Sequence, residues 1–352
     1  MMKIINVTHP TGEYPIYLGE GALAETGQRL AELGYTGACG VVTNKVVGDH
    51  HAEPLLESLR LAGFKPVQLD IPDGEQFKTL ATVADLYGQF IEAKLDRRSP
   101  IIALGGGVLG DTAGFAAASY LRGAPLVQIP TTLLAMVDAS VGGKTGVDLP
   151  QGKNLVGAFK QPEMVMVDPE VLATLPAVEF RAGLAEVVKH GIVAAPELFA
   201  ALETGRFELA WLLFEAINVK VRIVQEDPFE QGRRAVLNLG HTFGHAFERL
   251  SNFELRHGEG VAMGLACAAQ LATRLGRCAE DTTERIIALL KWLELSYQPP
   301  AYAPADVWTA MSADKKRQGY TLRFILPRAI GEVDIFEDIT QPDIAAVLST
   351  PL

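Results

Sequence analysis

The 352-residue chain has few cysteines, no long apolar run and no N-terminal export pattern. Its three cysteines, Cys39, Cys267 and Cys278, form no C-x-x-C pair and leave an odd count. This argues against a disulfide framework and favours a reducing compartment. No run reaches the about 18 apolar residues that a membrane helix needs, and no charged-then-apolar signal opens the chain. We therefore expect a cytoplasmic protein that does not enter a membrane.

Positive charge is also scarce. The net charge is -11, and no basic run is longer than the three residues from Lys315 to Arg317. A nucleic-acid or anionic-membrane partner is therefore not indicated, and an anionic substrate would have to meet a local basic cluster. The apolar content of 48% is that of a globular enzyme. The length favours two domains.

Residues 1–175 alternate short β-branched runs with amphipathic stretches. Strands are expected at 3–7, 14–18, 39–44, 65–71, 100–104 and 124–130, and helices at 22–34, 52–63 and 79–95. Alternation at this period predicts a mostly parallel, Rossmann-like sheet with helices on its faces. Such sheets bind ligands at the carboxyl ends of their strands.

Those strand ends carry glycines and polar residues. Gly105, Gly106 and Gly107 follow one strand and precede a helix, so their amides can approach an anion. Gly105, Gly107 and Gly110 match G-x-G-x-x-G, but the motif does not follow the first strand of the unit. A tight turn with a purely structural role is the alternative interpretation. Other strand ends are followed by residues that could hold a ribose or phosphate, or cap a helix. These residues are Asn44, Asp73, Glu75 and Lys78.

A second glycine-rich block spans residues 130–160. It is not a P-loop, because Asp138 stands where G-x-x-x-x-G-K-[ST] requires the first glycine. We expect irregular backbone here. Lys144, Lys153 and Asn154 on such backbone favour contacts to a substrate anion over a solvated surface.

Beyond residue 175 the pattern becomes helical, which predicts a second, all-α domain over 176–352. Glu186 and Lys189 lie three apart among small and apolar neighbours, so both charges are expected on a buried helix. Buried charges need partners, and a metal would suit Glu186. Tail strands within 320–336 are expected to pack on a sheet edge, and a helix is expected at 341–349.

Three of the seven histidines, His241, His245 and His257, lie close together in sequence. The first two are four apart, so a helix would place both imidazoles on one face. A polar strip on that helix is one interpretation. The other interpretation is that these two histidines and His257 form a three-ligand metal site with an open position.

Several separated blocks together resemble the 3-dehydroquinate synthase family over nearly the whole chain. They are ALGGGVLGDTAGFAA, QIPTTLLAMVDASVGGKTGVD, GKNLVGAF, RAGLAEVVKHG, LNLGHTFGHAFE and HGEGVAMG. The resemblance implies a nucleotide-binding α/β domain, a helical metal domain, a homodimer and an active site between the domains. It implies NAD and a divalent metal as cofactors. Zinc is the expected metal, and cobalt is the second candidate.

The resemblance also implies roles for individual residues. The metal ligands would be Glu186, His241 and His257, which makes His245 an active-site group and not a ligand. The substrate residues would be Arg122, Asp138, Lys144, Lys153, Asn154, Lys189, Lys220, Arg234, Asn238 and Lys315. The NAD residues would be Asn44, Asp73, Glu75, Lys78, Gly105, Gly106, Gly107, Asp111, Thr131, Thr132 and Thr174, together with Asp138, Lys144 and Lys153.

The implied substrate is a sugar-acid phosphate, 3-deoxy-D-arabino-heptulosonate 7-phosphate, and the product is 3-dehydroquinate. The implied sequence is transient oxidation by NAD, β-elimination of phosphate, reduction, ring opening and intramolecular aldol closure. His245 would move protons, because imidazole titrates near neutral pH, and the base in the elimination is either the substrate phosphate or a protein group. Alternatives are a related cyclase such as 2-epi-5-epi-valiolone or 2-deoxy-scyllo-inosose synthase, a glycerol-type dehydrogenase, or a silent NAD-binding protein.

Overall fold

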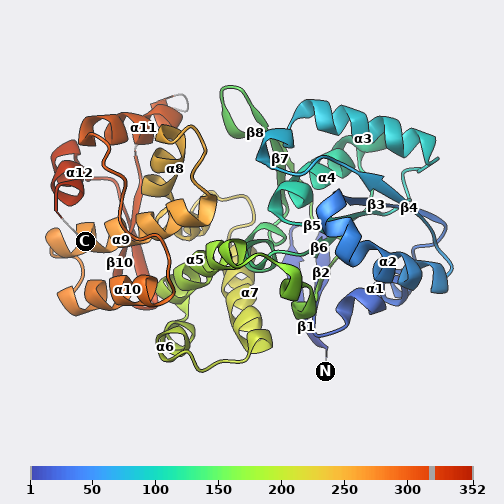
Figure 1. Cartoon of the computed structure of the whole chain (residues 1–352), viewed down its shortest axis with the longest axis horizontal. Helices are drawn as coiled ribbons and strands as arrows, with labels where there is room; N and C mark the ends of the chain where they lie inside the picture. Colours follow the sequence, from blue (N-terminus) through green and yellow to red (C-terminus); the bar gives the residue numbers. More distant parts are fainter. Residues whose placement is uncertain (1, 317–321, 351–352) are drawn as a thin grey trace. The chain divides into compact units, whose positions relative to one another are not determined.

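The computed structural model describes residues 2–316 and 322–350, and the side chains of 313–316 lie outside that description. The chain forms two compact units, Met1–Pro176 and Ala177–Leu352 (Figure 1), and the sequence predicts a boundary after residue 175. Within the described residues, no helix has both the length and the apolar character needed to cross a membrane.

Unit 1 is built on a seven-stranded sheet with the order β1-β2-β9-β6-β5-β3-β4. Only β1 and β2 pair antiparallel, and the remaining pairs are parallel, as the alternation predicts. Strands β5 and β6 are buried along their whole length, which explains their unbroken apolar sequences. The strands are β1 (Lys3–His9), β2 (Gly12–Leu18), β3 (Ala38–Thr43), β4 (Lys65–Asp70), β5 (Ile101–Gly105), β6 (Leu126–Pro130) and β9 (Met164–Val167).

Helices flank this sheet, and a core of apolar side chains from β5, α3 and α4 fills one side of it. Helix α2 begins after Asn44, whose side chain accepts a hydrogen bond from the Val47 amide. The helices are α1 (Ala22–Glu32), α2 (Lys45–Leu61), α3 (Leu80–Glu92) and α4 (Gly107–Ser119). The 3-10 turns are η1 (Glu75–Phe77), η2 (Tyr120–Arg122) and η4 (Pro169–Thr174), and η3 (Ala135–Ala139) is a π-helical turn.

The prediction of irregular backbone for 130–160 was wrong in its second half. Strands β7 (Lys144–Leu149) and β8 (Gly152–Phe159) form an antiparallel hairpin. Gly146 and Gly157 face each other across it, and a Cβ on Gly157 would lie 2.3 Å from the Thr145 carbonyl oxygen. These glycines therefore permit close strand contact and do not mark turns.

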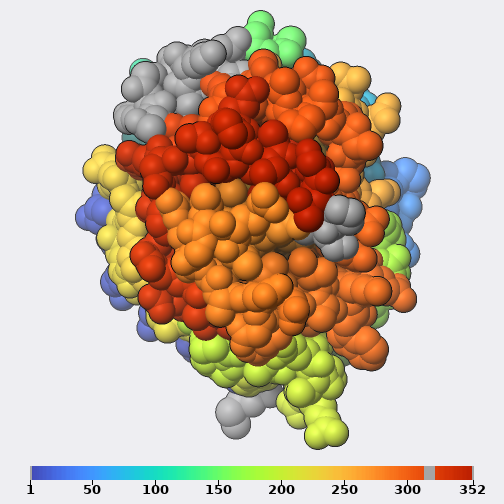
Figure 2. All heavy atoms as spheres, turned by 90° about the vertical axis from the view of Figure 1, so that its left-hand side faces the viewer, coloured from blue at the N-terminus to red at the C-terminus, as the bar shows by residue number. Residues whose placement is uncertain are grey.

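Unit 2 is mainly helical, as predicted. Its helices are α5 (Ala177–Ala194), α6 (Pro196–Thr204), α7 (Leu209–Glu226), α8 (His241–Leu250), α9 (His257–Arg274), α10 (Glu280–Trp292), α11 (Pro304–Lys316) and α12 (Gln341–Leu348), with the 3-10 turn η5 (Arg233–Asn238) before α8. Helix α9 is buried along most of its length and packs against α5, α8, α10 and α12. Figure 2 shows the unit 2 face on which the red atoms near the C-terminus lie beside orange ones.

The tail strands are present, but they do not join an edge of the large sheet. Strands β10 (Phe324–Ala329) and β11 (Glu332–Phe336) pair only with each other, in a two-stranded antiparallel sheet. The buried face of β10 packs on α9 within unit 2. The two tail strands, which are consecutive in the chain, therefore pair with each other.

Two glycines of α9 let neighbouring backbones come unusually close. A Cβ on Gly258 would lie 2.1 Å from the carbonyl oxygen of Ala182 in α5. A Cβ on Gly264 would lie 1.9 Å from the carbonyl oxygen of Gly240, just before α8. Both distances are impossible for any other residue, so glycine is what allows α5, α8 and α9 to meet.

Candidate active site

In unit 1, the predicted nucleotide residues gather at the switch point of the sheet. From β3 the chain passes to β4 on one side, and then to β5 on the other side of β3. The Thr43 hydroxyl donates to the Leu104 carbonyl across this point, at 3.0 Å. Asn44 and Gly106 thus follow adjacent strand ends. Open α/β sheets bind ligands at such a place.

The predicted glycines line a small recess next to this point. Gly105, Gly106 and Gly107 share the recess with Asp111 and with both ends of η3. Gly106 is the residue before α4, so the first amides of that helix face the recess and favour negative charge. Thr131 donates its amide to the Gly105 carbonyl at 3.0 Å, and the Thr132 hydroxyl accepts from the Ala135 amide at 3.2 Å.

A buried lysine joins two other predicted residues. The Lys78 ammonium lies 2.7 Å from the Asp111 carboxylate and donates to the Asn154 side-chain oxygen at 2.6 Å. Burial lowers the pKa of Lys78, but the carboxylates of Asp111, Glu75 and Asp148 together outweigh burial and raise it. Burial raises the pKa of Asp111 despite Lys78. The two contacts of Lys78 tie the β7–β8 hairpin to α4.

Other predicted residues of unit 1 lie at the edges of this network. Lys153 forms an ion pair with Glu75 at 3.5 Å, and Asn44 donates to Asp73 at 2.8 Å. Asp138 lies in the π-helical turn, and Lys144 begins β7. Thr174 ends η4 and its hydroxyl lies 2.8 Å from the ring of the half-buried His51, which is not among the predicted residues.

Two predicted substrate residues adopt left-handed backbone. Arg122 has φ 69 and Asn154 has φ 55. The Asn154 amide donates to the Asp148 carboxylate at 2.7 Å, which helps to hold the conformation. Asparagine tolerates this region, but for arginine it costs free energy that surrounding contacts must offset. Such strain is most frequent at functional sites.

In unit 2, Glu186, His241 and His257 bring one ligand atom each within 4.8 Å of one another. Glu186 comes from the middle of α5, and the two histidines begin α8 and α9. The Glu186 Oε1 atom lies 3.6 Å from His241 Nε2 and 3.5 Å from His257 Nε2. Its Oε2 atom forms a close ion pair with the buried Lys189 ammonium. The two carboxylate oxygens therefore face different partners.

The second ring nitrogen of each imidazole, Nδ1, also has a hydrogen-bond partner. His241 Nδ1 lies 3.2 Å from the Leu239 carbonyl oxygen, and His257 Nδ1 lies 2.9 Å from Glu248 Oε1. Because a carbonyl and a carboxylate only accept, each Nδ1 carries the proton. Each Nε2 is the atom that faces Glu186.

The two histidines differ in charge. Burial, followed by Lys189, holds the pKa of His241 well below its usual value, so His241 is neutral. Burial also lowers the pKa of His257, but hydrogen bonds to Glu186 and Glu248 outweigh it and raise the pKa to about 10. A metal that binds His257 Nε2 would therefore displace a proton.

The other predicted residues of unit 2 lie on neighbouring elements. Lys220 in α7 and Arg234 in η5 are buried cations, and Arg234 donates to the Pro228 carbonyl at 2.6 Å. Asn238 donates to Glu230 at 2.8 Å. The His245 ring is exposed and lies 5.2 Å from the His241 ring, centroid to centroid. Lys315 is in α11, but its side chain lies outside the described residues.

Sequence reasoning missed two carboxylates of this region, Glu248 and Glu230. Glu248 did leave a signal, because it follows His241 by seven residues and His245 by three, on the same helix face. Glu230 left none, since it stands in the loop before η5.

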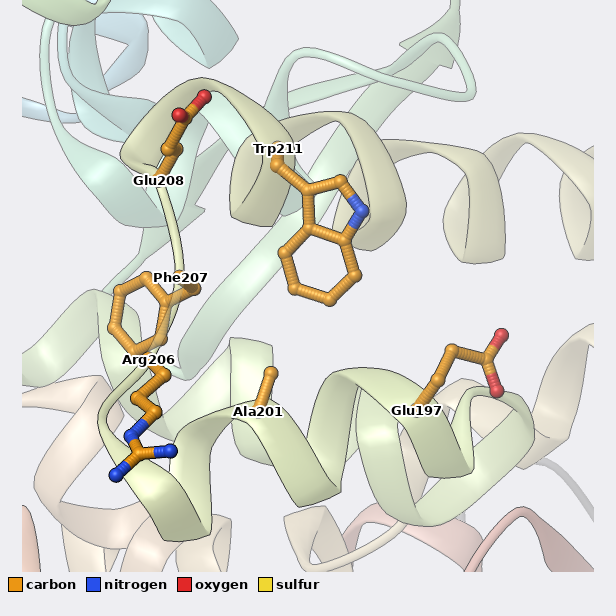
Figure 3. A pocket seen from close by; sticks show the side chains of 6 residues that line it. All are labelled: Glu197, Ala201, Arg206, Phe207, Glu208 and Trp211. Carbon is orange, nitrogen blue, oxygen red and sulfur yellow. The ribbon is translucent and has the colours of Figure 1, made fainter.

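A separate hollow of about 750 Å³ opens between α6 and α7. Trp211 of α7 points toward α6, where Ala201 and Glu197 line the other wall (Figure 3). None of the predicted site residues lines it, and it contains no histidine, cysteine or lysine. This hollow therefore lies apart from the candidate site.

Comparison with solved structures defines the class. The fold matches 2-epi-5-epi-valiolone synthase from Streptomyces hygroscopicus with NAD+ and Zn2+ bound, at TM-score 0.88 and 31% identity over 95% of both chains. It also matches 2-deoxy-scyllo-inosose synthase complexed with carbaglucose-6-phosphate, NAD+ and Co2+, at TM-score 0.86 and 25% identity over 99% of this chain and 100% of that one. The fold is that of the sugar phosphate cyclases.

Sequence comparison gives the family within this class. Residues 68–182 match the 3-dehydroquinate synthase N-terminal family, and residues 183–317 match the C-terminal one. A 3-dehydroquinate synthase of Geobacter metallireducens is 46% identical over 95% of both chains. The chain belongs to the 3-dehydroquinate synthase family.

Proposed function

We propose that this chain converts 3-deoxy-D-arabino-heptulosonate 7-phosphate into 3-dehydroquinate and phosphate, and that Glu186, His241 and His257 hold the divalent metal it needs. The activity is that of a carbon–oxygen lyase, in agreement with the family. The observation that carries the proposal is the convergence of one carboxylate and two imidazoles from three helices.

The residues present fit a metal. Two imidazoles with one carboxylate form a donor set typical of catalytic zinc, and three protein ligands leave a position open for substrate. Both Nδ1 atoms are already occupied, so both Nε2 atoms are directed at one point. The solved relatives with Zn2+ and Co2+ support the same two metals here.

The backbone donors beside the switch point suit the pyrophosphate of NAD. The amides at the start of α4 supply an anion site, and Gly105, Gly106 and Gly107 keep side chains out of it. Asn44 and Asp73, joined by a hydrogen bond, suit the hydroxyls of a ribose. Glu75, Lys78, Asp111, Thr131, Thr132 and Thr174 complete the proposed NAD residues.

The substrate has a carboxylate and a phosphate, whereas the chain has a net charge of -11. We assign its binding to Arg122, Lys144, Lys153, Lys189, Lys220, Arg234 and Lys315, with Asp138, Asn154 and Asn238. Buried cations such as Arg234 bind anions strongly, because water does not screen them there. Local cations thus offset the acidic surface.

When bound, the metal supplies Lewis acidity toward the substrate hydroxyls, and NAD supplies a reversible hydride acceptor. The residues of the chain orient the substrate and move its protons. We assign proton transfer to His245, whose exposed imidazole projects from the same helix face as His241. Lys189 holds one oxygen of Glu186, which leaves the other directed at the histidines.

The test is phosphate release from the heptulosonate phosphate with NAD and zinc, with the NADH absorbance recorded in the same cuvette. We expect metal-dependent release without net NADH, since the hydride is returned in each turnover. EDTA-treated protein is the control. No release would contradict the proposal and favour a sugar phosphate that lacks a carboxylate, and net NADH with a polyol would favour a dehydrogenase.

Two variants separate the metal ligands from the proton shuttle. His257→Ala is expected to lose bound zinc and activity together, because two ligands seldom retain the metal. His245→Ala is expected to keep stoichiometric zinc and to lose turnover by about 100-fold or more. Stoichiometric zinc in His257→Ala, measured by elemental analysis, would refute the ligand assignment.

We also propose that the chain works as a homodimer in the cytoplasm. The support for the compartment is the set of three free, buried cysteines, and the support for the dimer is the family resemblance. Light scattering on the purified protein would measure the mass. A monomer at working concentration would contradict the dimer.

A further inference from the structure

We propose that Glu248 is a positioning residue for the metal site: its carboxylate fixes the His257 ring so that Nε2, and not Nδ1, faces the metal. The inference rests on the proposed function, because it assumes a metal on Glu186, His241 and His257. It adds a residue that binds neither metal nor substrate directly.

The contact is short and well protected. Glu248 Oε1 lies 2.9 Å from His257 Nδ1, and the Glu248 side chain is 2% exposed. Glu248 belongs to α8 and His257 begins α9, so the hydrogen bond links two helices. A carboxylate that is removed from water and accepts a ring N–H holds that ring strongly in place.

The backbone around Glu248 also favours this role. The Glu248 carbonyl accepts from the Phe253 amide at 2.8 Å and from the Ser251 hydroxyl at 2.8 Å, where α8 ends. Gly260 of α9 gives the carboxylate room, since a Cβ there would lie 3.2 Å from Glu248 Oε1. The carboxylate is therefore confined between α8 and the first turn of α9.

The two histidines of the site are fixed by different means. His241 Nδ1 meets a backbone carbonyl, that of Leu239. His257 begins α9 after a loop, and Glu248 supplies the corresponding acceptor from a side chain. An outer acceptor of this kind sets the tautomer of a ligand and raises its basicity, and its loss weakens metal binding about 10-fold to 100-fold.

A second interpretation is that Glu248 is itself a ligand. His245, Glu248 and His257 also bring ligand atoms within 4.8 Å of one another. A metal there would require His257 Nδ1 to lose its proton, but that atom already lies at hydrogen-bond distance from Glu248. We therefore favour one metal, with Glu248 outside its ligand set. A proton retained on His257 Nδ1 in the zinc-loaded chain decides between the two, because a metal on that atom would displace it.

The experiment measures zinc affinity by competition with a chromophoric chelator, for the full chain and for Glu248→Ala and Glu248→Gln. We expect one zinc per chain, an affinity lower by about 10-fold to 100-fold in the alanine variant, and a smaller loss in the glutamine variant. The amide oxygen of glutamine still accepts from Nδ1, but it has no charge. Because glutamine matches glutamate in size, this variant tests the proposal even if the alanine variant folds poorly.

A spectroscopic readout and a control separate positioning from a general structural effect. In the zinc-loaded chain, nitrogen-15 NMR should show His257 with a protected proton on Nδ1, and this signal should be lost in Glu248→Ala. Glu259→Gln is the matched control, because Glu259 accepts from the Arg256 amide at the start of α9 and caps that helix. It should leave zinc affinity and the NMR signal unchanged.

Three results would overturn the inference. They are unchanged zinc affinity in Glu248→Ala, a retained Nδ1 proton signal in that variant, or two zinc ions per wild-type chain with one lost in Glu248→Gln. A wild-type chain that binds no zinc would refute the metal site and the inference together. A chain that binds one zinc but releases no phosphate would refute the proposed reaction alone, and the affinity comparison would still test Glu248.

Discussion

In unit 1 the candidate residues stand at strand ends and in turns, whereas in unit 2 they stand on helices packed backbone against backbone. Asn44 and Gly106 occupy the first positions after β3 and β5. Glu186, by contrast, is in the middle of α5 and is fully buried. Unit 1 therefore builds its site from residues at the ends of strands. Unit 2 builds its site from residues inside helices or at their starts.

Gly106 of unit 1 and Gly258 of unit 2 show the same contrast. A Cβ on Gly106 would meet the Thr132 side chain at 3.1 Å, and a side chain can move by a few tenths of an ångström. A Cβ on Gly258 would meet backbone at 2.1 Å, and a packed helix has no room to yield. The site of unit 2 thus depends on interhelix distance, and that of unit 1 on local hydrogen bonds.

The largest effect is expected from Gly258→Ala, which would break the site of unit 2. The new Cβ would push α9 away from α5, and so separate His257 from Glu186. We expect a loss of about 3 kcal/mol in the free energy of unfolding, together with weaker zinc binding. Urea unfolding and a zinc titration measure the two. Wild-type zinc affinity in this variant would show that interhelix distance does not control the site.

A smaller effect is expected from Asn44→Ala in unit 1. It removes the cap of α2 and the hydrogen bond to Asp73, which should cost about 1 kcal/mol of stability and weaken NAD binding. Thr340→Ala is the control, because it disturbs the capping box of α12 and touches no proposed NAD residue. Equal NAD affinity in the two variants would contradict the assignment of Asn44.

The smallest effect, and of opposite sign, is expected from Gly88→Ala. Gly88 lies within α3, and a Cβ there would meet nothing within 4 Å. Alanine should stabilise unit 1 by about 0.5 to 1 kcal/mol, because it restricts the unfolded chain and favours helix. Urea unfolding measures the shift, with NAD and zinc affinities unchanged. Destabilisation would mean that α3 is more tightly packed than the structure shows.

Much of the fold could be predicted from local pattern. The alternation over residues 1–175 predicted the parallel sheet, because a buried strand needs an apolar run and its crossover helix needs an apolar face. The β7–β8 hairpin escaped prediction, since its glycines permit strand contact and so resemble turn signals. The partner of the tail strands was likewise missed, because pairing depends on which strand edge lies nearby.

For the site, the sequence by itself determined which residue types were available and which of them shared a helix face. The spacing of His241 and His245 follows from the helix period, and the small residues around Glu186 follow from burial. Only the tertiary structure decided that Glu186 meets His241 and His257, that Lys78 joins Asp111 to Asn154, and that Glu248 reaches His257 Nδ1. The physical reason is that these contacts join different elements, whose distance is set by backbone packing that no local spacing encodes.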